Sequence, residues 1–508
     1  MQFFNSQGLG KCVFTKSANY TTPCQLLKKK GIAQWATRIA GTGNDNISFI
    51  TSDSSGNIYM TGYYASNPLT IYNADGSTFG TLANAGSDDI CVVKYNPAGT
   101  AQWATRLAGT GSDQGFGITS DSPGNSYTVG TYTSNPLTIY NADGSTFGTL
   151  PYSGSGGDIC VVKYNTAGTA QWVTRLAGSL NDQGYRITSD SSGNIYVTGP
   201  YASNPLTIYN ADGSTFGTLA NAGSDDIYVV KYNATTGTAQ WATRLAGTGG
   251  DVSFAITNDS SGNIYVLGYY TSNPITIYNA DTSTFGTLAN AGSNDICVVK
   301  YNPAGTAQWM ARLAGTGNDV GYGIKSDSFG NIYILGNYAS NPLTIYNADG
   351  STFGTLANAG SDDIYVVKYN ATTGTAQWAT RLAGSLSDQG YRITSDSSGN
   401  IYVTGPYASN PLTIYNADGS TFGTLGNAGS NDVYVVKYNP AGTAQWATRL
   451  TGTGNDQGFG ITSDSSGNIY VTGTYTSNPL TIYNSDSSTF GTLTNSGSND
   501  IFIVKISN

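Results

Sequence analysis

Seven tryptophans recur along the chain at intervals of 68 or 69 residues, each within a version of the phrase AQWATRLAG. They are Trp35, Trp103, Trp172, Trp241, Trp309, Trp378 and Trp446. A period this long, filled with short β-type runs and Gly/Asn/Asp turns, is typical of a closed radial array of sheets rather than of a row of separate domains. The chain of 508 residues therefore contains seven copies of one sequence repeat.

The second unit shows the strands that each repeat is expected to contribute. Residues 115–121 and 125–132 predict the first two strands, and residues 158–165 and 169–178 predict the last two. The long connection between the two pairs carries its own hairpin, residues 137–150, with Asn/Asp-Gly residues at the tip. We therefore expect four-stranded blades, with seven hairpins and seven GTGSDQG-type loops crowded on one face of the ring.

The two ends of the repeat region predict how the ring closes. The first Trp strand spans residues 33–41, and the chain ends with the strand of residues 501–508, so the last unit lacks its fourth strand. If the first strand completes the last blade, no strand edge is left open at the seam. The expected fold is an all-β, seven-bladed β-propeller over residues 33–508, preceded by a separate tail of residues 1–32.

The repeated phrases resemble a known family. GITSDSSGNIYVTG, followed by IYVVKYN, a Gly turn and a Trp, is similar to the SBBP class of β-propeller repeats and, more loosely, to the NHL class with its D-x-x-G-N-I-Y segment. The resemblance covers residues 33–508 and implies a propeller. It does not choose a function, because propellers of this kind serve as enzymes, lectins and scaffolds.

The charged residues restrict the possible chemistry. The chain contains no His, all 31 of its acids are Asp, and the net charge is −9. A general base would have to be an Asp, a Lys or a Tyr with a shifted pKa, and no Asp is unique to one blade. We therefore expect no enzyme, no cofactor and no bound metal, and the acidic body argues against nucleic acid as a partner.

The chain shows no sign of membrane insertion. No apolar run approaches about 18 residues, so no transmembrane segment is expected, and the N-terminal residues lack the basic start and apolar stretch of a secretory signal. The localisation stays open, with an extracellular or virion surface suspected from the family resemblance.

Most repeated motifs have a structural interpretation beside a functional one. The DSSGN turns indicate Asp-capped β-turns, with calcium binding as the alternative. The Arg of each W-x-x-R motif is expected to pair with a repeated Asp. The tryptophans are expected to pack between blades, with sugar stacking as the alternative. Cys91, Cys160 and Cys297 are interpreted as small hydrophobic residues, and Cys12 and Cys24 are left as a possible pair.

Two arginines break the sevenfold symmetry. Arg186 and Arg392 occur in DQGYRITSD, at the start of the strand expected to line the channel, where other units carry Phe49, Ala255 or Gly. They are expected to face one another within a rim formed by one loop Asp from each of the seven units, and to hold a carboxylate or a sulfate. The alternative is a trace of the duplication of a three-unit block. The candidate binding residues at the channel mouth are Arg186, Arg392, Asp113, Asp182, Asp319 and Asp388.

Three functions are compatible with the sequence. The leading one is a non-catalytic, monomeric ring that presents its loop-rich face to a protein or glycan as a structural or attachment component. The second is a multivalent lectin that gains avidity from several weak sites. The third is a lyase or a hydrolase.

Overall fold

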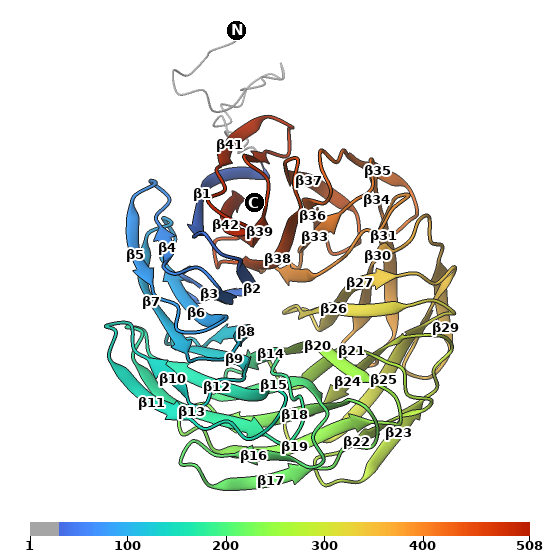
Figure 1. Ribbon diagram of the computed structural model, residues 1–508. Helices are drawn as coiled ribbons and strands as arrows, with labels where there is room; N and C mark the ends of the chain where they lie inside the picture. Colours follow the sequence, from blue (N-terminus) through green and yellow to red (C-terminus); the bar gives the residue numbers. More distant parts are fainter. Residues whose placement is uncertain (1–29) are drawn as a thin grey trace, which may run out of the picture.

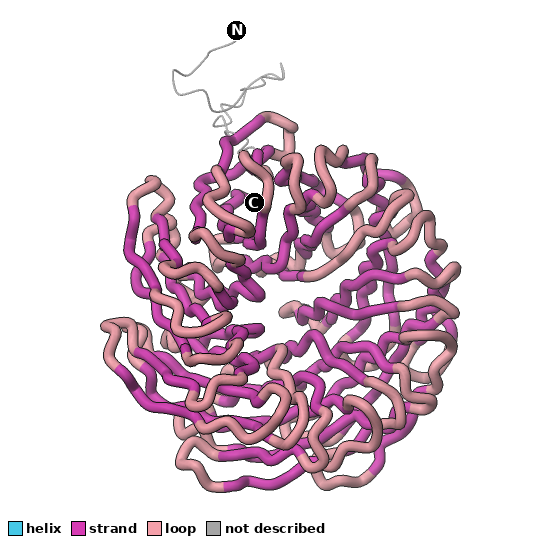
Figure 2. Tube along the Cα trace, in the orientation of Figure 1, coloured by secondary structure: helices cyan, strands magenta, loops and turns pink. Residues whose placement is uncertain are grey.

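A computed structural model describes residues 30–508, which form a closed ring of seven β-sheets (Figure 1). The expected tail of residues 1–32 lies almost wholly outside the described residues, as do Cys12 and Cys24. The described part consists of strands and loops, as Figure 2 shows. Within residues 30–508, no helix has the length and apolarity needed to cross a membrane. The fold is an all-β, seven-bladed propeller.

Each sheet has six strands, which run from the axis of the ring to its outer wall. The innermost strands are β2 Asp45–Ser52, β8 Asp113–Ser120, β14 Arg186–Ser189, β20 Asp251–Asn258, β26 Asp319–Ser326, β32 Arg392–Ser395 and β38 Asp456–Ser463. The second strands are β3 Ile58–Tyr64, β9 Ser126–Tyr132, β15 Asn194–Tyr201, β21 Ile264–Tyr270, β27 Asn331–Tyr338, β33 Ile401–Tyr407 and β39 Ile469–Tyr475. The third strands are β6 Asp89–Tyr95, β12 Asp158–Tyr164, β18 Asp226–Asn233, β24 Asp295–Tyr301, β30 Asp363–Asn370, β36 Asp432–Tyr438 and β42 Asp500–Ser507.

The outer half of each sheet holds the Trp strand and a hairpin. The Trp strands are β1 Ile32–Ala40, β7 Ala101–Ala108, β13 Ala170–Ala177, β19 Ala239–Ala246, β25 Ala307–Ala314, β31 Ala376–Ala383 and β37 Ala444–Thr451. The fifth strands are β4 Leu69–Tyr72, β10 Leu137–Tyr140, β16 Leu206–Tyr209, β22 Ile275–Tyr278, β28 Leu343–Tyr346, β34 Leu412–Tyr415 and β40 Leu480–Tyr483. The outermost strands are β5 Thr78–Leu82, β11 Thr146–Leu150, β17 Thr215–Leu219, β23 Thr284–Leu288, β29 Thr352–Leu356, β35 Thr421–Leu425 and β41 Thr489–Leu493.

The expectation of four-stranded blades is therefore wrong, because the hairpin joins the sheet. In one blade the strand order is β11-β10-β7-β6-β3-β2, and β10 pairs with the Trp strand β7 through Thr138↔Ala108 and Ile139↔Leu107. The alternation of the hairpin strand buries Leu137 and Ile139 and covers an edge that would otherwise be open. The hairpins form the outer wall (Figure 1) instead of crowding one face of the ring.

The first and last strands of the described chain share one sheet. β1 pairs antiparallel with β42, from Ile32↔Ser507 to Ile39↔Ile501, with one irregularity between Ala33 and Trp35. The same sheet continues inward to β39 and β38 and outward to β4 and β5. One blade is thus built from both ends of the repeat region.

The hydrophobic core lies between neighbouring blades, and the tryptophans belong to it. The Trp103 ring lies 6.1 Å from the Tyr59 ring of its own blade, while its Nε1 donates a hydrogen bond of 3.0 Å to the Thr166 carbonyl of the next blade. The prediction that the tryptophans pack between blades is confirmed.

The DSSGN turns are closed by their own aspartate. Asp53 Oδ1 accepts hydrogen bonds from the backbone N–H groups of Ser55 and Asn57, both at 2.9 Å. Its Oδ2 accepts from the Asn57 amide at 2.8 Å and from the Tyr59 hydroxyl at 3.0 Å. Protein donors therefore occupy both oxygens, as a capped β-turn requires.

Candidate functional site

The axis of the ring is lined by a collar of aromatic side chains. In β8 the register shifts between Gly115 and Gly117, which leaves Phe116 as the extra residue of a β-bulge. Bulges re-aim a side chain relative to the regular alternation of the strand. The collar consists of Phe116, Tyr185, Phe254, Tyr322, Tyr391 and Phe459, whose successive ring centroids lie 5.0–5.4 Å apart. All six side chains are half-buried, so the collar retains exposed ring surface.

The two symmetry-breaking arginines lie one residue beyond the collar, and they meet at one ring. The Arg186 Cζ lies 5.2 Å from the centroid of the Phe49 ring, and the Arg392 Cζ lies 5.4 Å from the same centroid. The structure therefore brings together three side chains that depart from the small residues of most repeats at this position.

Each of these arginines is bonded to backbone carbonyls of the collar. Arg392 Nη1 donates to the carbonyl oxygens of Tyr322 and Tyr391 at 2.9 and 2.7 Å. Arg186 Nη1 donates to the equivalent carbonyls of Phe116 and Tyr185. The guanidinium groups are thereby fixed to the backbone of the collar residues.

The two guanidinium groups are buried without a carboxylate partner. Arg186 is 7% exposed and Arg392 is 9% exposed, and the ion pairs formed between residues 30–508 include neither of them. Both Nε atoms also lack a hydrogen-bond partner. Burial lowers the pKa of Arg186 to about 9. The inner layer of the ring thus holds two guanidinium groups that have no ion-pair partner among residues 30–508, although leaving a buried charge uncompensated costs about 3–5 kcal/mol.

The four loop acids grouped with these arginines serve a different purpose. Asp113 is fully buried, and it accepts a 2.6 Å hydrogen bond from the Ser134 hydroxyl as well as bonds from the Thr133 and Ser134 backbone. Asp182, Asp319 and Asp388 are also fully buried and accept backbone N–H bonds from the corresponding loops. These acids therefore hold the loops, and no ion pair joins them to Arg186 or Arg392.

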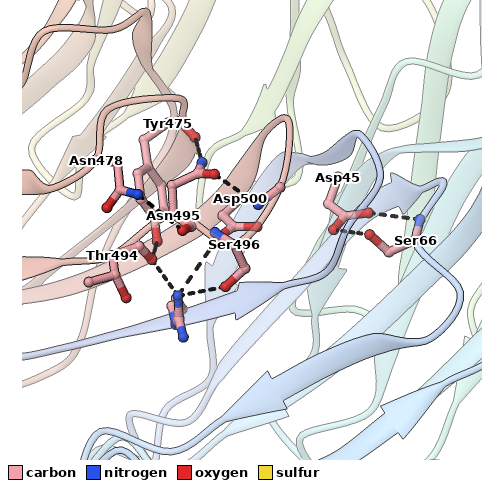
Figure 3. Close-up of polar contacts among 10 residues, drawn as sticks. Asp45, Ser66, Tyr475, Asn478, Thr494, Asn495, Ser496 and Asp500 are labelled. Carbon is pink, nitrogen blue, oxygen red and sulfur yellow. Dashed lines mark hydrogen bonds and ion pairs between the residues drawn. The ribbon is translucent and has the colours of Figure 1, made fainter.

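Figure 3 shows Asp45, at the start of β2, and Asp500, at the start of β42 in the neighbouring sheet. Asp45 accepts hydrogen bonds from the Ser66 hydroxyl at 2.6 Å and from its backbone N–H at 3.1 Å. Asp500 accepts a bond from the Ser496 backbone. Burial raises the pKa of Asp45 to about 6, with a smaller contribution from the charge of Asp500. The same causes act in the other blades: burial raises the pKa of Asp182 and of Asp319 to about 6.

The W-x-x-R arginines correct another expectation. Between residues 30–508, Arg–Asp pairing is limited to Arg38–Asp500 and Arg175–Asp158, each at 3.9 Å. In all seven blades the Arg instead lies 4.4–4.9 Å above a Tyr ring at the end of the fifth strand. The aromatic partner was missed because it comes from the hairpin, whose place in the sheet was not anticipated.

The outer wall repeats one aromatic surface seven times. The outermost strands expose Phe79, Phe147, Phe216, Phe285, Phe353, Phe422 and Phe490, each 38–41% accessible to solvent. Beside Phe79 lies a groove of about 670 Å³ between adjacent hairpins, lined also by Gln102, Trp103, Arg106 and Asp143. A corresponding groove of about 450 Å³ lies beside Phe353.

A family model for the SBBP β-propeller repeat matches the chain six times, at residues 34–68, 102–137, 171–199, 308–341, 377–405 and 445–480. The chain therefore contains β-propeller repeats of the SBBP type. The matched segments begin at the Trp strands, and the remaining unit, around Trp241, has the same strands as the six that match.

Curated relatives of this SBBP-repeat chain are longer than the chain itself. It is 28% identical to an uncharacterized WD repeat-containing protein of Acanthamoeba polyphaga mimivirus, over 93% of this chain and 38% of that protein. It is 23% identical to the regulatory protein FlaEY of Caulobacter vibrioides, over 72% of this chain and 36% of that protein. The chain thus spans less than two fifths of the length of either relative.

Solved propellers resemble the SBBP-repeat ring only distantly. The Dos1 propeller has a TM-score of 0.39 at 9% identity, over 93% of this chain and 95% of that one. The PQQ domain of pyranose dehydrogenase from Coprinopsis cinerea has a TM-score of 0.31 at 12% identity, over 94% of this chain and 97% of that one. Both scores are below 0.5, so these structures say nothing further about the chain.

Proposed function

We propose that this SBBP-repeat propeller is a non-catalytic scaffold that binds a protein partner along its outer wall. The observation that carries the proposal is the sevenfold repetition of an exposed Phe on the outermost strand. That strand also presents unpaired backbone groups, because no further strand follows it in the sheet. Backbone pairing at a sheet edge, together with an apolar anchor, is a general mode of peptide recognition.

The proposed absence of catalysis rests on the hydrogen bonding of the aspartate side chains. The buried loop acids are held by serine hydroxyls and backbone N–H groups, as in Asp45. The turn acids are held by an amide and a tyrosine hydroxyl, as in Asp53. Both oxygens of Asp45 and of Asp53 are engaged within the fold. Asp182 Oδ2 and Asp388 Oδ2 have no hydrogen-bond partner among residues 30–508, but neither class of acid is confined to one blade.

The outer wall is tested by site-specific cross-linking of the full chain. A photoreactive phenylalanine analogue is placed at Phe79 and, as the matched control, at Ser191 in an exposed turn. After irradiation in the native source, we expect one discrete protein adduct from Phe79 and none from Ser191. Identical adducts at both positions would contradict the assignment of the outer wall.

A purified partner then allows a stricter test. Replacing the seven outer phenylalanines with Thr should leave the circular dichroism spectrum unchanged and weaken binding by at least tenfold, because every anchor is lost. Unchanged affinity would show that the partner binds elsewhere. Light scattering on the same samples tests whether the ring alone is monomeric, as we propose.

A second candidate function, a multivalent lectin, is favoured by the composition of the grooves. An exposed Phe lies beside Gln102 and Asp143, so an apolar ring and polar hydrogen-bonding groups share one cleft. Weak sites repeated around the wall would reinforce one another through avidity. Glycan-array binding that a free monosaccharide competes away, in the absence of a protein adduct, would favour the lectin over the protein scaffold.

A further inference from the structure

The channel through the ring carries features that the outer-wall scaffold does not use. The collar consists of six half-buried aromatic side chains, and two buried guanidinium groups are hydrogen-bonded to its backbone carbonyls. Both features depart from the sevenfold repeat, because the arginines occur in two units only and the collar lacks an aromatic residue in one.

The break in the collar lies in the blade that begins with β2. Ser48 occupies the bulge position there, between Ile47 and Phe49 in the register, where the other six units carry an aromatic residue. β2 packs between β8 and β38, so the gap lies between Phe116 and Phe459. We call this position the notch, because Ser48 takes the place of an aromatic side chain between Phe116 and Phe459.

The residue that follows the notch in the sequence lies close to both arginines. Phe49 is the residue that follows Ser48, and both arginines lie within 5.4 Å of the centroid of its ring. Their Nε–H groups are buried and have no acceptor among residues 30–508. The residue that follows Ser48 thus lies close to two guanidinium groups, each of which retains one unpaired donor.

We propose that the axial channel binds an acidic sugar. Its carboxylate accepts hydrogen bonds from Arg186 and Arg392, because guanidinium groups suit oxyanions in both charge and geometry. Its ring occupies the notch at Ser48, with its apolar faces against Phe116 and Phe459. Ligand sites commonly combine such apolar walls with a few fixed polar groups.

The polar groups around the notch suit the hydroxyls of a sugar. Asn46, two residues before Ser48, donates its amide to the Tyr63 hydroxyl at 3.1 Å, and its amide oxygen can accept from a ligand. On the neighbouring strand, Gln114 donates to Asp88 at 3.3 Å. An anion without hydroxyl groups would form no hydrogen bonds of this kind with these side chains.

The proposal is tested by titration calorimetry of the full chain with glucuronate. Glucose and inorganic sulfate serve as comparisons, since the first lacks the charge and the second lacks the ring. We expect glucuronate to bind at least tenfold more tightly than either. Sulfate binding as tight as glucuronate, or no heat with any of the three, would overturn the proposal.

Three variants separate the parts of the site. The double variant R186G/R392G removes the charge and introduces the residue already present as Gly117, Gly323 and Gly460, so we expect it to fold. S48F closes the notch with the aromatic residue type of the other six units while it retains both arginines. F79T alters only the outer wall and is the matched control.

The expected pattern distinguishes this site from the scaffold function. Glucuronate affinity should fall at least tenfold in R186G/R392G and in S48F and stay unchanged in F79T, with circular dichroism showing that each variant is folded. Equal affinity in R186G/R392G and the original chain would refute the channel site and leave the outer-wall proposal untouched. A loss in F79T alone would place the sugar on the outer wall and refute the channel site as well.

Discussion

Neutralising one buried loop acid should stabilise the protein, and only at neutral and alkaline pH. Asp45 is fully buried and accepts hydrogen bonds from the hydroxyl and the backbone of Ser66. In Asp45→Asn, the side-chain oxygen can still accept from the backbone N–H, and the new amide can donate to the Ser66 hydroxyl oxygen. The substitution therefore retains the geometry while it removes the charge.

The expected magnitude follows from the pKa of this carboxyl. Burial raises that pKa from 3.8 to about 6, so the folded state disfavours the ionised form. A group shifted upward adds stability that is fully present below its unfolded pKa and is lost as the pH rises through its folded pKa. At about 1.4 kcal/mol per pKa unit, the cost at pH 8 is about 3 kcal/mol. Asn removes this cost, and at pH 3.5 the two proteins should be equally stable.

The assay is denaturant unfolding at pH 3.5 and pH 8, followed by circular dichroism. The matched control is Asp75→Asn at an exposed hairpin tip, where hydrogen bonds from Ser77 lower the pKa of the aspartate. A lowered pKa has the opposite sign, so the control should lose stability at pH 8 and lose less in acid. If Asp45→Asn destabilises the protein equally at both pH values, ionisation of Asp45 does not affect the stability of the fold, and the reasoning is refuted.

Two further predictions concern the closure of the ring and the packing of its turns. Deleting residues 1–44 removes β1 and opens the edge of β42, so the unfolding midpoint should fall and light scattering should detect self-association; an unchanged, monomeric protein would contradict this. Gly99 and Gly76 have nearly equal backbone φ angles of +81° and +83°, but an added Cβ would lie 2.9 Å from the Trp35 ring at Gly99 and would meet nothing at Gly76. Gly99→Ala should therefore lower the stability more than Gly76→Ala, whose cost of about 1 kcal/mol reflects the φ angle alone. Equal losses in thermal unfolding would contradict this, because they would show that the turn moves away from the Trp35 ring without cost.

The sequence predicts the ring well because its strongest signals are periodic. The recurrence of Trp within a fixed phrase implies identical neighbours, and identical neighbours around an axis imply a propeller. The capped turn at Asp53 was also predictable, because an Asp at the start of a Gly-containing turn bonds its own backbone. These features depend on local order along the chain.

The features that the sequence did not reveal depend on which strands meet in space. Leu137 and Ile139 mark a half-buried strand, but their alternation does not say which edge the strand covers. The Tyr partners of the W-x-x-R arginines come from the hairpin strand, so they could not be predicted without knowing that this strand pairs with the Trp strand. The collar had a readable signal, since the third residue after each loop Asp is aromatic in six units and is Ser48 in the seventh. Its position on the axis depends on a β-bulge, and bulges leave no reliable mark in a single sequence.

Each covalent repeat is out of phase with the blades. The blade of β2, β3 and β6 takes its other three strands, β7, β10 and β11, from the following repeat, and the blade of β38, β39 and β42 takes them from the first. Every repeat therefore shares its strands equally between two sheets, and no repeat can complete a blade by itself. Each repeat therefore links two neighbouring sheets, and a duplicated repeat would contribute three strands to each of two sheets. Because each repeat gives three strands to each of two sheets, the number of blades equals the number of repeats.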